Sequence, residues 1–390
     1  MPPSPRSAAA RLLDFLRAEA ASGVVLILAT AVALVWANVS PAGYHHFWST
    51  ALSLPGPEHA LSREQWVNEG LMTIFFFVVG LEIKRELVEG DLRDPRAAAV
   101  PIAAAIGGMV LPAGIYLAVT AGSDAVHGWG IPMATDIAFA VGILRLAGGR
   151  APRSLGVTLL TLAIVDDLGA ILVIAVFYSS GISFAWLLGA LGLLVLIRLA
   201  GRLLANPWWF VVPAVLLWLE MLRAGVHATL AGVLLGLVTP VVARNGRPVL
   251  TSLEHALHPW SSFLVLPLFA VANAGVVISP AALRHAATDP AAIGIVAGLL
   301  VGKFVGINGG IRLADRLGGR PSTDLTGRAH GALGLLGGIG LTVCLFIADL
   351  SFSGRQLESA KLAILVGSAL AAVLAAVTLR TVRPVSDGAT

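Results

Sequence analysis

Charged residues are scarce in this chain of 390 residues: only 12% are Asp, Glu, Lys or Arg, while 57% are hydrophobic. Soluble domains carry about 25% charged residues, so this composition excludes an ordinary soluble protein. Cysteine is almost absent too. Cys344 is the only one, which excludes an intrachain disulfide. The first residues, Met1-Pro-Pro-Ser-Pro-Arg6, do not have the apolar core and cleavage site of a signal peptide, so none is expected.

Long apolar runs and a mean hydropathy of +0.87 indicate a chain that crosses a membrane many times. We predict an all-α polytopic membrane protein with about twelve transmembrane helices and one transmembrane domain over residues 1–390. The helices are expected near residues 22–39, 68–88, 97–120, 130–147, 154–178, 182–200, 206–219, 222–240, 259–278, 290–313, 327–350 and 357–380. The polar connection 49–65, with Pro55-Gly56-Pro57, could form a hairpin.

Lys and Arg fall unevenly on the two sides of this arrangement. Twenty of the 26 lie at the termini or in even-numbered connections, five lie in odd-numbered connections, and Lys303 lies inside the membrane. Basic residues near helix ends accumulate on the cytoplasmic side. Both termini are therefore predicted to be cytoplasmic.

Two adjacent acids, Asp166 and Asp167, lie near the middle of the apolar run from Leu155 to Phe177. A charged residue at that depth costs about 2.5–3.5 kcal/mol on insertion scales, so such residues usually line a cavity or an ion pathway. Helix neighbours point about 100° apart, so each acid is expected to have its own partner. A plain helix–helix hydrogen bond is the structural alternative, and it is disfavoured for a double acid at this depth.

Asp136 and Lys303 complete the set of deep ionisable residues. Lys303 needs a counter-charge, and a salt bridge to one acid of the pair is the simplest arrangement, which leaves the other acid for a cation. Asp136 lies at a predicted helix break, where it can offset the partial charges of half-helix ends. Thr135 adds a neutral oxygen. Such oxygen ligands predict an alkali-cation site rather than a zinc or copper site.

Two predicted helices, the fourth and the eleventh, contain interruptions. Pro132 breaks the fourth, because proline removes a backbone donor and clashes with the preceding turn. The eleventh has a glycine run that includes Gly337, Gly338 and Gly340, although such runs also serve tight helix packing. The break precedes the acid pair in helices three to five and follows Lys303 in helices ten to twelve. This order predicts inverted repeats, with the ion site where the broken helices cross. The predicted segments are 22–93 (helices one and two), 94–180 (first repeat), 181–289 (helices six to nine) and 290–382 (second repeat).

Motifs from eight helices or loops resemble those of the bacterial NhaA-type sodium/proton antiporters along nearly the whole chain. They are Trp66-Val-Asn-Glu-Gly-Leu-Met72, Gly80-Leu-Glu-Ile-Lys-Arg-Glu-Leu87, Ala105-Ile-Gly-Gly-Met109, Ala134-Thr-Asp-Ile-Ala-Phe-Ala140, Val165-Asp-Asp-Leu-Gly-Ala-Ile171, Gly225-Val-His-Ala-Thr-Leu-Ala-Gly232, Leu253-Glu-His-Ala-Leu-His-Pro-Trp260 and Leu268-Phe-Ala-Val-Ala-Asn-Ala-Gly275. Inverted repeats are an established feature of that family, so the resemblance implies the same architecture.

The resemblance implies a pH-regulated, electrogenic antiporter that exports Na⁺ or Li⁺ in exchange for a larger number of protons. Asp167 would be the primary carboxylate for cation and proton, and Asp166 would exchange a salt bridge with Lys303. Asp136 would balance the half-helix ends, and Thr135 would line the site, so that Asp167, Asp166 and Thr135 hold Na⁺. The implied protein is no enzyme, needs no cofactor, binds no nucleic acid, and forms homodimers in the lipid bilayer of the bacterial inner membrane, partly through the hairpin after helix one.

A second group of residues matches family positions that are implicated in pH control: Glu82, Glu86, Glu254, His255, His258 and His227. Their structural alternative is ordinary, because acids and histidines at helix ends are usually just solvated. The chain departs from the family pattern at Phe304, where proline is expected, and at Arg328-Ala-His330, which begins the eleventh helix.

Three other classes of membrane protein can be compared with this pattern. An intramembrane aspartyl protease has its two acids on different helices, one of them in a Gly-x-Gly-Asp motif that is missing here. A light-driven pump could use Lys303 as a Schiff base, but twelve helices with internal breaks do not suit it. A proton-coupled symporter of small organic anions is the main alternative. It would need unpaired cations at the midplane, where the chain has three acids and one lysine.

Overall fold

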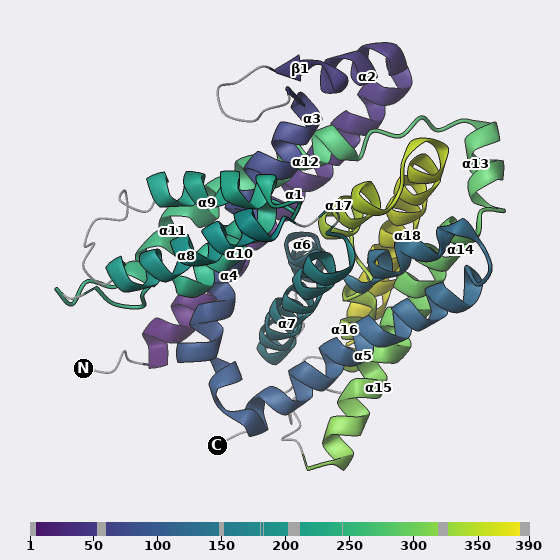
Figure 1. Ribbon diagram of the computed structural model, residues 1–390. Coiled ribbons are helices and arrows are strands. Elements are labelled where there is room, and N and C mark those ends of the chain that lie inside the picture. Colours follow the sequence, from purple (N-terminus) through teal and green to yellow (C-terminus); the bar gives the residue numbers. More distant parts are fainter. Residues whose placement is uncertain are drawn as a thin grey trace. The chain divides into compact units, whose positions relative to one another are not determined.

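The computed structural model describes residues 5–52, 60–147, 152–179, 181, 183–201, 211–243, 245–318 and 327–382. Those residues form helices and one two-stranded hairpin (Figure 1). The chain separates into two compact units, each built from segments that are far apart in sequence. Unit 1 comprises Met1–Ala31, Pro95–Asp166 and Ile278–Thr390, and unit 2 comprises Val32–Asp94 and Asp167–Val277. The all-helical class is confirmed, while the single domain with four consecutive segments stays a prediction.

Unit 1 contains both interrupted helices. Its elements are the first part of α1 (Pro5–Val39), α5 (Pro95–Val119), the 3-10 helix η3 (Asp124–Met133), α6 (Ile137–Ala147), the first part of α7 (Arg153–Phe177), α13 (Pro280–Ala286), α14 (Pro290–Ala297), the π-helical turn η6 (Gly298–Gly302), α15 (Lys303–Arg316), α16 (Gly327–Leu336), α17 (Thr342–Ser351) and α18 (Gly354–Thr381). Helices α5 and α15 lie side by side (Figure 1). A Cβ atom on Gly107 would lie 2.1 Å from the carbonyl oxygen of Gly306, so glycine lets the two backbones meet.

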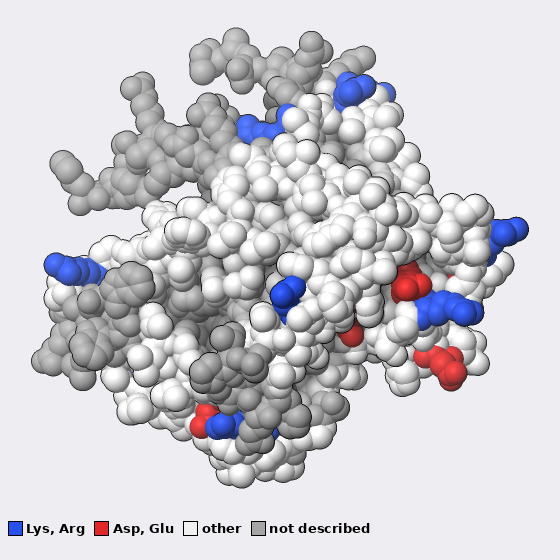
Figure 2. Space-filling model, turned by 90° about the horizontal axis from the view of Figure 1, so that it is seen from above, with Lys and Arg blue, Asp and Glu red and all other residues white. Residues whose placement is uncertain are grey.

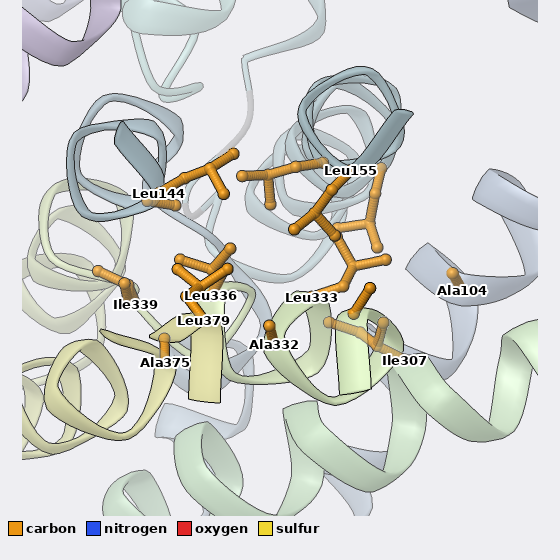
Figure 3. Close-up of a cluster of buried hydrophobic side chains, with 14 of the residues drawn as sticks. Ala104, Leu144, Leu155, Ile307, Ala332, Leu333, Leu336, Ile339, Ala375 and Leu379 are labelled. Carbon is orange, nitrogen blue, oxygen red and sulfur yellow. The ribbon is translucent and has the colours of Figure 1, made fainter. Parts of the chain in front are cut away.

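The apolar core of unit 1 holds the elements that carry the deep polar residues. Leu144 of α6, Leu155 of α7, and Leu333 and Leu336 of α16 point toward one another (Figure 3). Leu379 of α18 joins them from the last helix. Lipid is as apolar as leucine, so close van der Waals packing, not expulsion of water, favours this arrangement.

Unit 2 is built around helix α4. Its elements are the rest of α1 and of α7, α2 (Pro41–Ser49), β1 (Ala51–Leu52), β2 (Leu61–Ser62), α3 (Arg63–Gln65), the π-helical turn η1 (Trp66–Leu71), α4 (Met72–Glu89), the 3-10 turn η2 (Asp91–Arg93), α8 (Phe184–Ala200), α9 (Val211–Arg223), α10 (Thr229–Val238), α11 (Val249–Trp260), the π-helical turn η5 (Ser261–Val265) and α12 (Leu266–Asn273). A Cβ on Gly232 of α10 would lie 2.2 Å from the carbonyl oxygen of Thr73 in α4. The two helices therefore touch through their backbones.

The predicted hairpin between the first two helices is present. Strand β1 pairs with β2 in antiparallel register, with Ala51 opposite Ser62 and Leu52 opposite Leu61. Residues 53–59, which include Pro55-Gly56-Pro57, lie outside the described residues. The hairpin's predicted role in a dimer is not tested by this pairing.

Six helices among the described residues are long and apolar enough to cross a membrane, and η3 with α6 makes a seventh span if the bent pair counts as one. Shorter apolar helices, such as α8, α10 and α17, accompany them. The face in Figure 2 is largely uncharged, and its Lys, Arg, Asp and Glu side chains occur in small separate groups. These features fit a polytopic membrane protein; the count of twelve spans stays a prediction.

Four predicted helices have different boundaries in the structure. The first was expected at 22–39, but α1 runs from Pro5 to Val39, with its apolar span at Ala21–Val39. The ninth helix was expected at 259–278 but runs from Val249 to Asn273 through α11, η5 and α12, because the polar residues of α11 lower its hydropathy. The eighth was expected at 222–240, yet α10 starts only at Thr229, after a reversal at Gly225 with a φ of 72°. The seventh was expected at 206–219; α9 covers Val211–Arg223, and residues 206–210 lie outside the described part.

The fourth predicted helix differs in kind. Asp124–Met133 is a 3-10 helix that contains Pro132, and the interruption lies at residues 134–136, before α6. The break therefore follows Pro132 instead of occurring at it, and η3 and α6 are bent by 50°. In the eleventh helix the gap lies between Leu336 and Thr342, and it contains the predicted Gly337, Gly338 and Gly340.

Candidate ion-binding site

The lysine in the middle of the tenth helix pairs with one of the two adjacent acids. Lys303 Nζ lies 2.6 Å from Asp166 Oδ2, and both side chains are completely buried. The π-helical turn η6 leads directly into Lys303, and a Cβ on Gly298 of that turn would lie 2.7 Å from the Cβ of Pro132. The glycine thus brings the lysine's helix against the end of η3.

Thr135 provides a second contact for the lysine. Lys303 Nζ donates to Thr135 Oγ1 at 3.1 Å, and the same hydroxyl donates to the carbonyl oxygen of Gly337 at 2.8 Å. Thr135 lies in the gap between η3 and α6, and Gly337 begins the gap between α16 and α17. One hydroxyl therefore links the lysine to both interruptions.

Asp136 satisfies the starts of two half-helices. Its Oδ1 accepts from Phe139 N–H in the first turn of α6 at 3.0 Å, which is an N-cap bond. Its Oδ2 accepts from the backbone N–H and the hydroxyl of Thr342, the first residue of α17, at 3.1 and 2.8 Å. Its own N–H donates to the carbonyl oxygen of Ile339 at 2.7 Å. The carboxylate thus lies against the positive ends of both helix dipoles, which favours its charged form.

Asp167 follows Asp166 on α7 and is 5% exposed. The helical turn of about 100° per residue directs its side chain away from that of Asp166. Asp166 Oδ1 is buried and accepts no hydrogen bond among the described residues. Within unit 1, Asp166 and Thr135 thus offer a carboxylate oxygen and a hydroxyl oxygen, the ligands that hard cations take.

The predicted pH-control residues lie in unit 2, where α4 packs against α11. Arg85 Nη1 lies 2.6 Å from Glu254 Oε1, and the glutamate side chain is only 2% exposed. His258 Nε2 lies 3.9 Å from Glu82 Oε1. Four side chains therefore form two ion pairs between the helices when His258 is protonated.

Two further members of that predicted group take different positions. His255 is exposed on α11, and it neighbours the buried Glu254 in sequence. Glu86 is partly buried on α4, and a Cβ on Gly90 would lie 2.3 Å from its carboxyl carbon. Of the two histidines, His258 is thus the one that faces α4.

His227 lies between α9 and α10, apart from the α4–α11 contacts. Its Nε2 donates to the carbonyl oxygen of Tyr178 at 2.8 Å, and its Nδ1 lies 3.7 Å from Glu69 Oε1. Burial lowers the pKa of His227, but Glu69 and the Tyr178 carbonyl raise it more, so the pKa lies above its ordinary value. Because Nε2 carries a hydrogen to the carbonyl, a second proton on Nδ1 would create an ion pair with Glu69.

Three residues that sequence reasoning did not single out contribute to these contacts. Thr342 donates to Asp136, Arg85 pairs with Glu254, and Glu69 Oε2 accepts from Ala228 N–H at the start of α10. Arg85 could have been found, because it lies beside two acids of the predicted group. A threonine after a glycine run carries no comparable signal.

Comparison with known proteins identifies the family. The sequence model of the family described as Na+/H+ antiporter 1 matches residues 13–379. The chain is 45% identical to Na(+)/H(+) antiporter NhaA 1 of Saccharopolyspora erythraea, over 99% of this chain and 96% of that one. It is 44% identical to Na(+)/H(+) antiporter NhaA 2 of Myxococcus xanthus, over 95% and 89% of the two chains. With Na(+)/H(+) antiporter NhaA of Oleidesulfovibrio alaskensis the identity is 43%, over 92% and 90%. The chain is therefore a multi-pass membrane protein that belongs to the Na+/H+ antiporter 1 family, the NhaA-type antiporters.

Proposed function

We propose that this protein exchanges Na⁺ or Li⁺ for protons, and that Asp167 is the group on which the two ions compete. The observation that carries the proposal is the buried ion pair between Lys303 and Asp166. That pair neutralises one acid of the two, so the next residue on α7, Asp167, is the acid assigned to the transported ion. Asp166 and Thr135 supply further oxygens for Na⁺.

Competition at one carboxylate explains coupling without a separate gate. A protonated carboxyl has lost the charge that attracts a cation, and a bound cation disfavours protonation, so the two occupants exclude each other. Asp136 is assigned a different part, because its two oxygens accept hydrogen bonds from Phe139 and Thr342 at the starts of two half-helices. Its role is to hold the half-helices α6 and α17 in place.

The test of this proposal is Na⁺-driven proton flux in proteoliposomes, with the membrane voltage controlled. When an imposed gradient drives Na⁺ across the membrane, the wild-type protein should move protons in the opposite direction. Asp167→Asn should abolish that proton flux. Glu358→Gln, which changes an exposed acid at the start of α18, is the matched control and should retain it. Flux in Asp167→Asn near the wild-type level, at equal reconstitution, contradicts the assignment.

We propose that the protein lies in the bacterial inner membrane with both termini in the cytoplasm. The twenty basic residues on one side of the predicted arrangement support this orientation. A fluorescent protein fused after Thr390 should be bright, because it folds in the cytoplasm. Alkaline phosphatase fused at the same residue should be inactive, and an active fusion contradicts the orientation.

The resemblance supports two finer features of the proposed activity. Exchange is electrogenic, with more protons than sodium ions per cycle. When the ion gradients alone drive no net flux, an imposed voltage should therefore drive one, and its sign should set the direction. The protein is a homodimer in which the β1–β2 hairpin meets a second copy. Removal of residues 51–62 should then shift the protein toward monomers in size-exclusion chromatography with light scattering. Symport of organic anions has no support from the relatives, whose names all describe Na+/H+ antiporters.

A further inference from the structure

The interruption between α16 and α17 frees backbone groups at residues 337–341, all of which are buried. In a membrane every such group needs a partner within the protein. The N–H groups of Gly337, Gly338 and Ile339 donate back to the carbonyl oxygens of the last turns of α16, at 2.9 to 3.1 Å. Thr342 N–H donates to Asp136. Gly340 N–H has a different kind of partner.

That partner is a serine on another helix. Gly340 N–H donates to Oγ of Ser368 in α18 at 3.2 Å, and Ser368 is 3% exposed. Serine and threonine in helices commonly donate to the carbonyl oxygen four residues earlier. Thr378 of α18 does so, with its hydroxyl 2.8 Å from the carbonyl oxygen of Leu374. Ser368 differs because its oxygen accepts a hydrogen bond from the interrupted helix.

The Gly340 peptide is where the two interruptions touch. A Cβ on Gly340 would lie 2.6 Å from the carbonyl oxygen of Ala134 and 2.5 Å from Cys344 Sγ, so no larger residue fits. On one side of Gly340, Ile339 accepts from the Asp136 N–H. On the other side, Thr342 donates twice to the Asp136 carboxylate.

We propose that Ser368 is a positioning residue for the ion site, acting through the Gly340 peptide. Its oxygen fixes the orientation of that peptide, and the peptide sets the places of Ile339 and Thr342 against Asp136. The Gly337 carbonyl oxygen, in the same interruption, holds the Thr135 hydroxyl that contacts Lys303. Ser368 touches no transported ion. The expected effect of Ser368 on transport rests on the proposed function. The expected effect on hydrogen bonding in the interruption between α16 and α17 does not.

The transport test compares Ser368→Ala with Ser368→Thr, which keeps a hydroxyl. Loss of the acceptor should raise the apparent KM for Na⁺ about fivefold, which converts to about 1 kcal/mol, while kcat changes less. Ser368→Thr should restore KM toward the wild-type value. The control is Thr378→Val, which removes an α18 hydroxyl that bonds only within its own helix in the described contacts, and it should leave KM unchanged. A wild-type KM in Ser368→Ala overturns the proposal.

Hydrogen exchange followed by mass spectrometry gives a readout that is independent of transport. Peptides that cover residues 337–342 should exchange faster in Ser368→Ala than in wild type or Ser368→Thr, because Gly340 N–H has lost its acceptor. Equal exchange in all three proteins overturns the proposal. If Ser368→Ala does not fold, slow exchange of Gly340 in wild-type protein and in Ser368→Thr supports it, and fast exchange in both overturns it. Absence of Na⁺-driven flux from wild type would overturn the proposed function alone.

Discussion

Asp136 Oδ2 accepts two hydrogen bonds from a single residue, Thr342, one from its backbone N–H at 3.1 Å and one from its hydroxyl at 2.8 Å. The aspartate precedes α6 and the threonine begins α17, so the contact joins the two interrupted helices at their breaks. A carboxylate here opposes the positive ends of two helix dipoles at once.

Thr342→Val keeps the shape of the side chain and the backbone donor but removes the hydroxyl. Hydrogen bonds to charged groups contribute about 1.5–3 kcal/mol, so the variant should unfold at a clearly lower temperature than wild type. Thr342→Ser keeps the donor and should stay close to wild type. The measurement is thermal unfolding of the purified protein in detergent. Equal melting temperatures for the Val and Ser variants would show that the hydroxyl contributes nothing.

Sequence alone could predict that Lys303 pairs with an acid, because a buried ammonium without a counter-charge is unfavourable. The residue pattern by itself does not indicate which acid, although the resemblance to the NhaA-type antiporters implies Asp166. Asp166 and Asp167 are neighbours on α7, and their side-chain directions depend on the rotation of that helix, which tertiary packing sets. The contact with Asp166 at 2.6 Å comes from the structure.

Helix boundaries show a second limit of sequence reasoning. Hydropathy located the apolar second half of the ninth helix. It missed α11, because polar residues alternate with apolar ones there and lower the mean hydropathy. Pro132 was expected to mark the interruption, but a 3-10 helix accommodates it, and the chain leaves helical geometry two residues later. The glycines at Gly337, Gly338 and Gly340 did mark the other interruption, because glycine loses more backbone freedom in a helix than any other residue.

Removal of one partner of the buried ion pair should be more damaging than removal of both. Lys303→Met leaves Asp166 as an uncompensated charge, and breaking such a pair costs about 3–5 kcal/mol. In the double variant Lys303→Met/Asp166→Asn no buried charge is left unpaired. We therefore expect its melting temperature to lie above that of Lys303→Met. Asp166→Asn alone completes the comparison. If the decrease in melting temperature of the double variant equals the sum of the decreases of the two single variants, the residues do not interact energetically.

The contact between His227 and Glu69 should make stability depend on pH. The pKa of His227 is raised in the folded protein, so the folded state binds a proton more tightly than the unfolded state does. The resulting stabilisation is fully present below the ordinary pKa of about 6.5 and is lost as pH rises through the raised pKa.

His227→Gln removes this titrating group. The difference in melting temperature between wild type and His227→Gln should be largest in acid and should shrink as pH rises past neutrality. His285→Gln, which changes an exposed histidine on α13, should give no such trend. A difference between wild type and His227→Gln that is constant from pH 5 to pH 9 would contradict the proton-dependent contact.

The last prediction separates the two histidines of α11. His258 lies 3.9 Å from Glu82 across the α4–α11 contact, whereas His255 is exposed. Protonated His258 can pair with the Glu82 carboxylate, and the pair disappears as pH rises, so the packing of α4 on α11 depends on pH. Competition between protons and Na⁺ at Asp167 also opposes exchange in acid, but saturating Na⁺ should overcome it.

Na⁺-driven flux measured across pH at low and at saturating Na⁺ therefore distinguishes a sensor from competition. The pair exists only in acid, where exchange is low, and His258→Ala removes it. Exchange in this variant should therefore begin at a lower pH, so the pH of half-maximal flux should move toward acid at both Na⁺ concentrations. A contact of about 1 kcal/mol corresponds to a shift of about 0.7 pH unit. His255→Ala, the matched control three residues away, should keep the wild-type midpoint. If His258→Ala keeps the wild-type midpoint at saturating Na⁺, the contact between His258 and Glu82 does not control the pH dependence of transport.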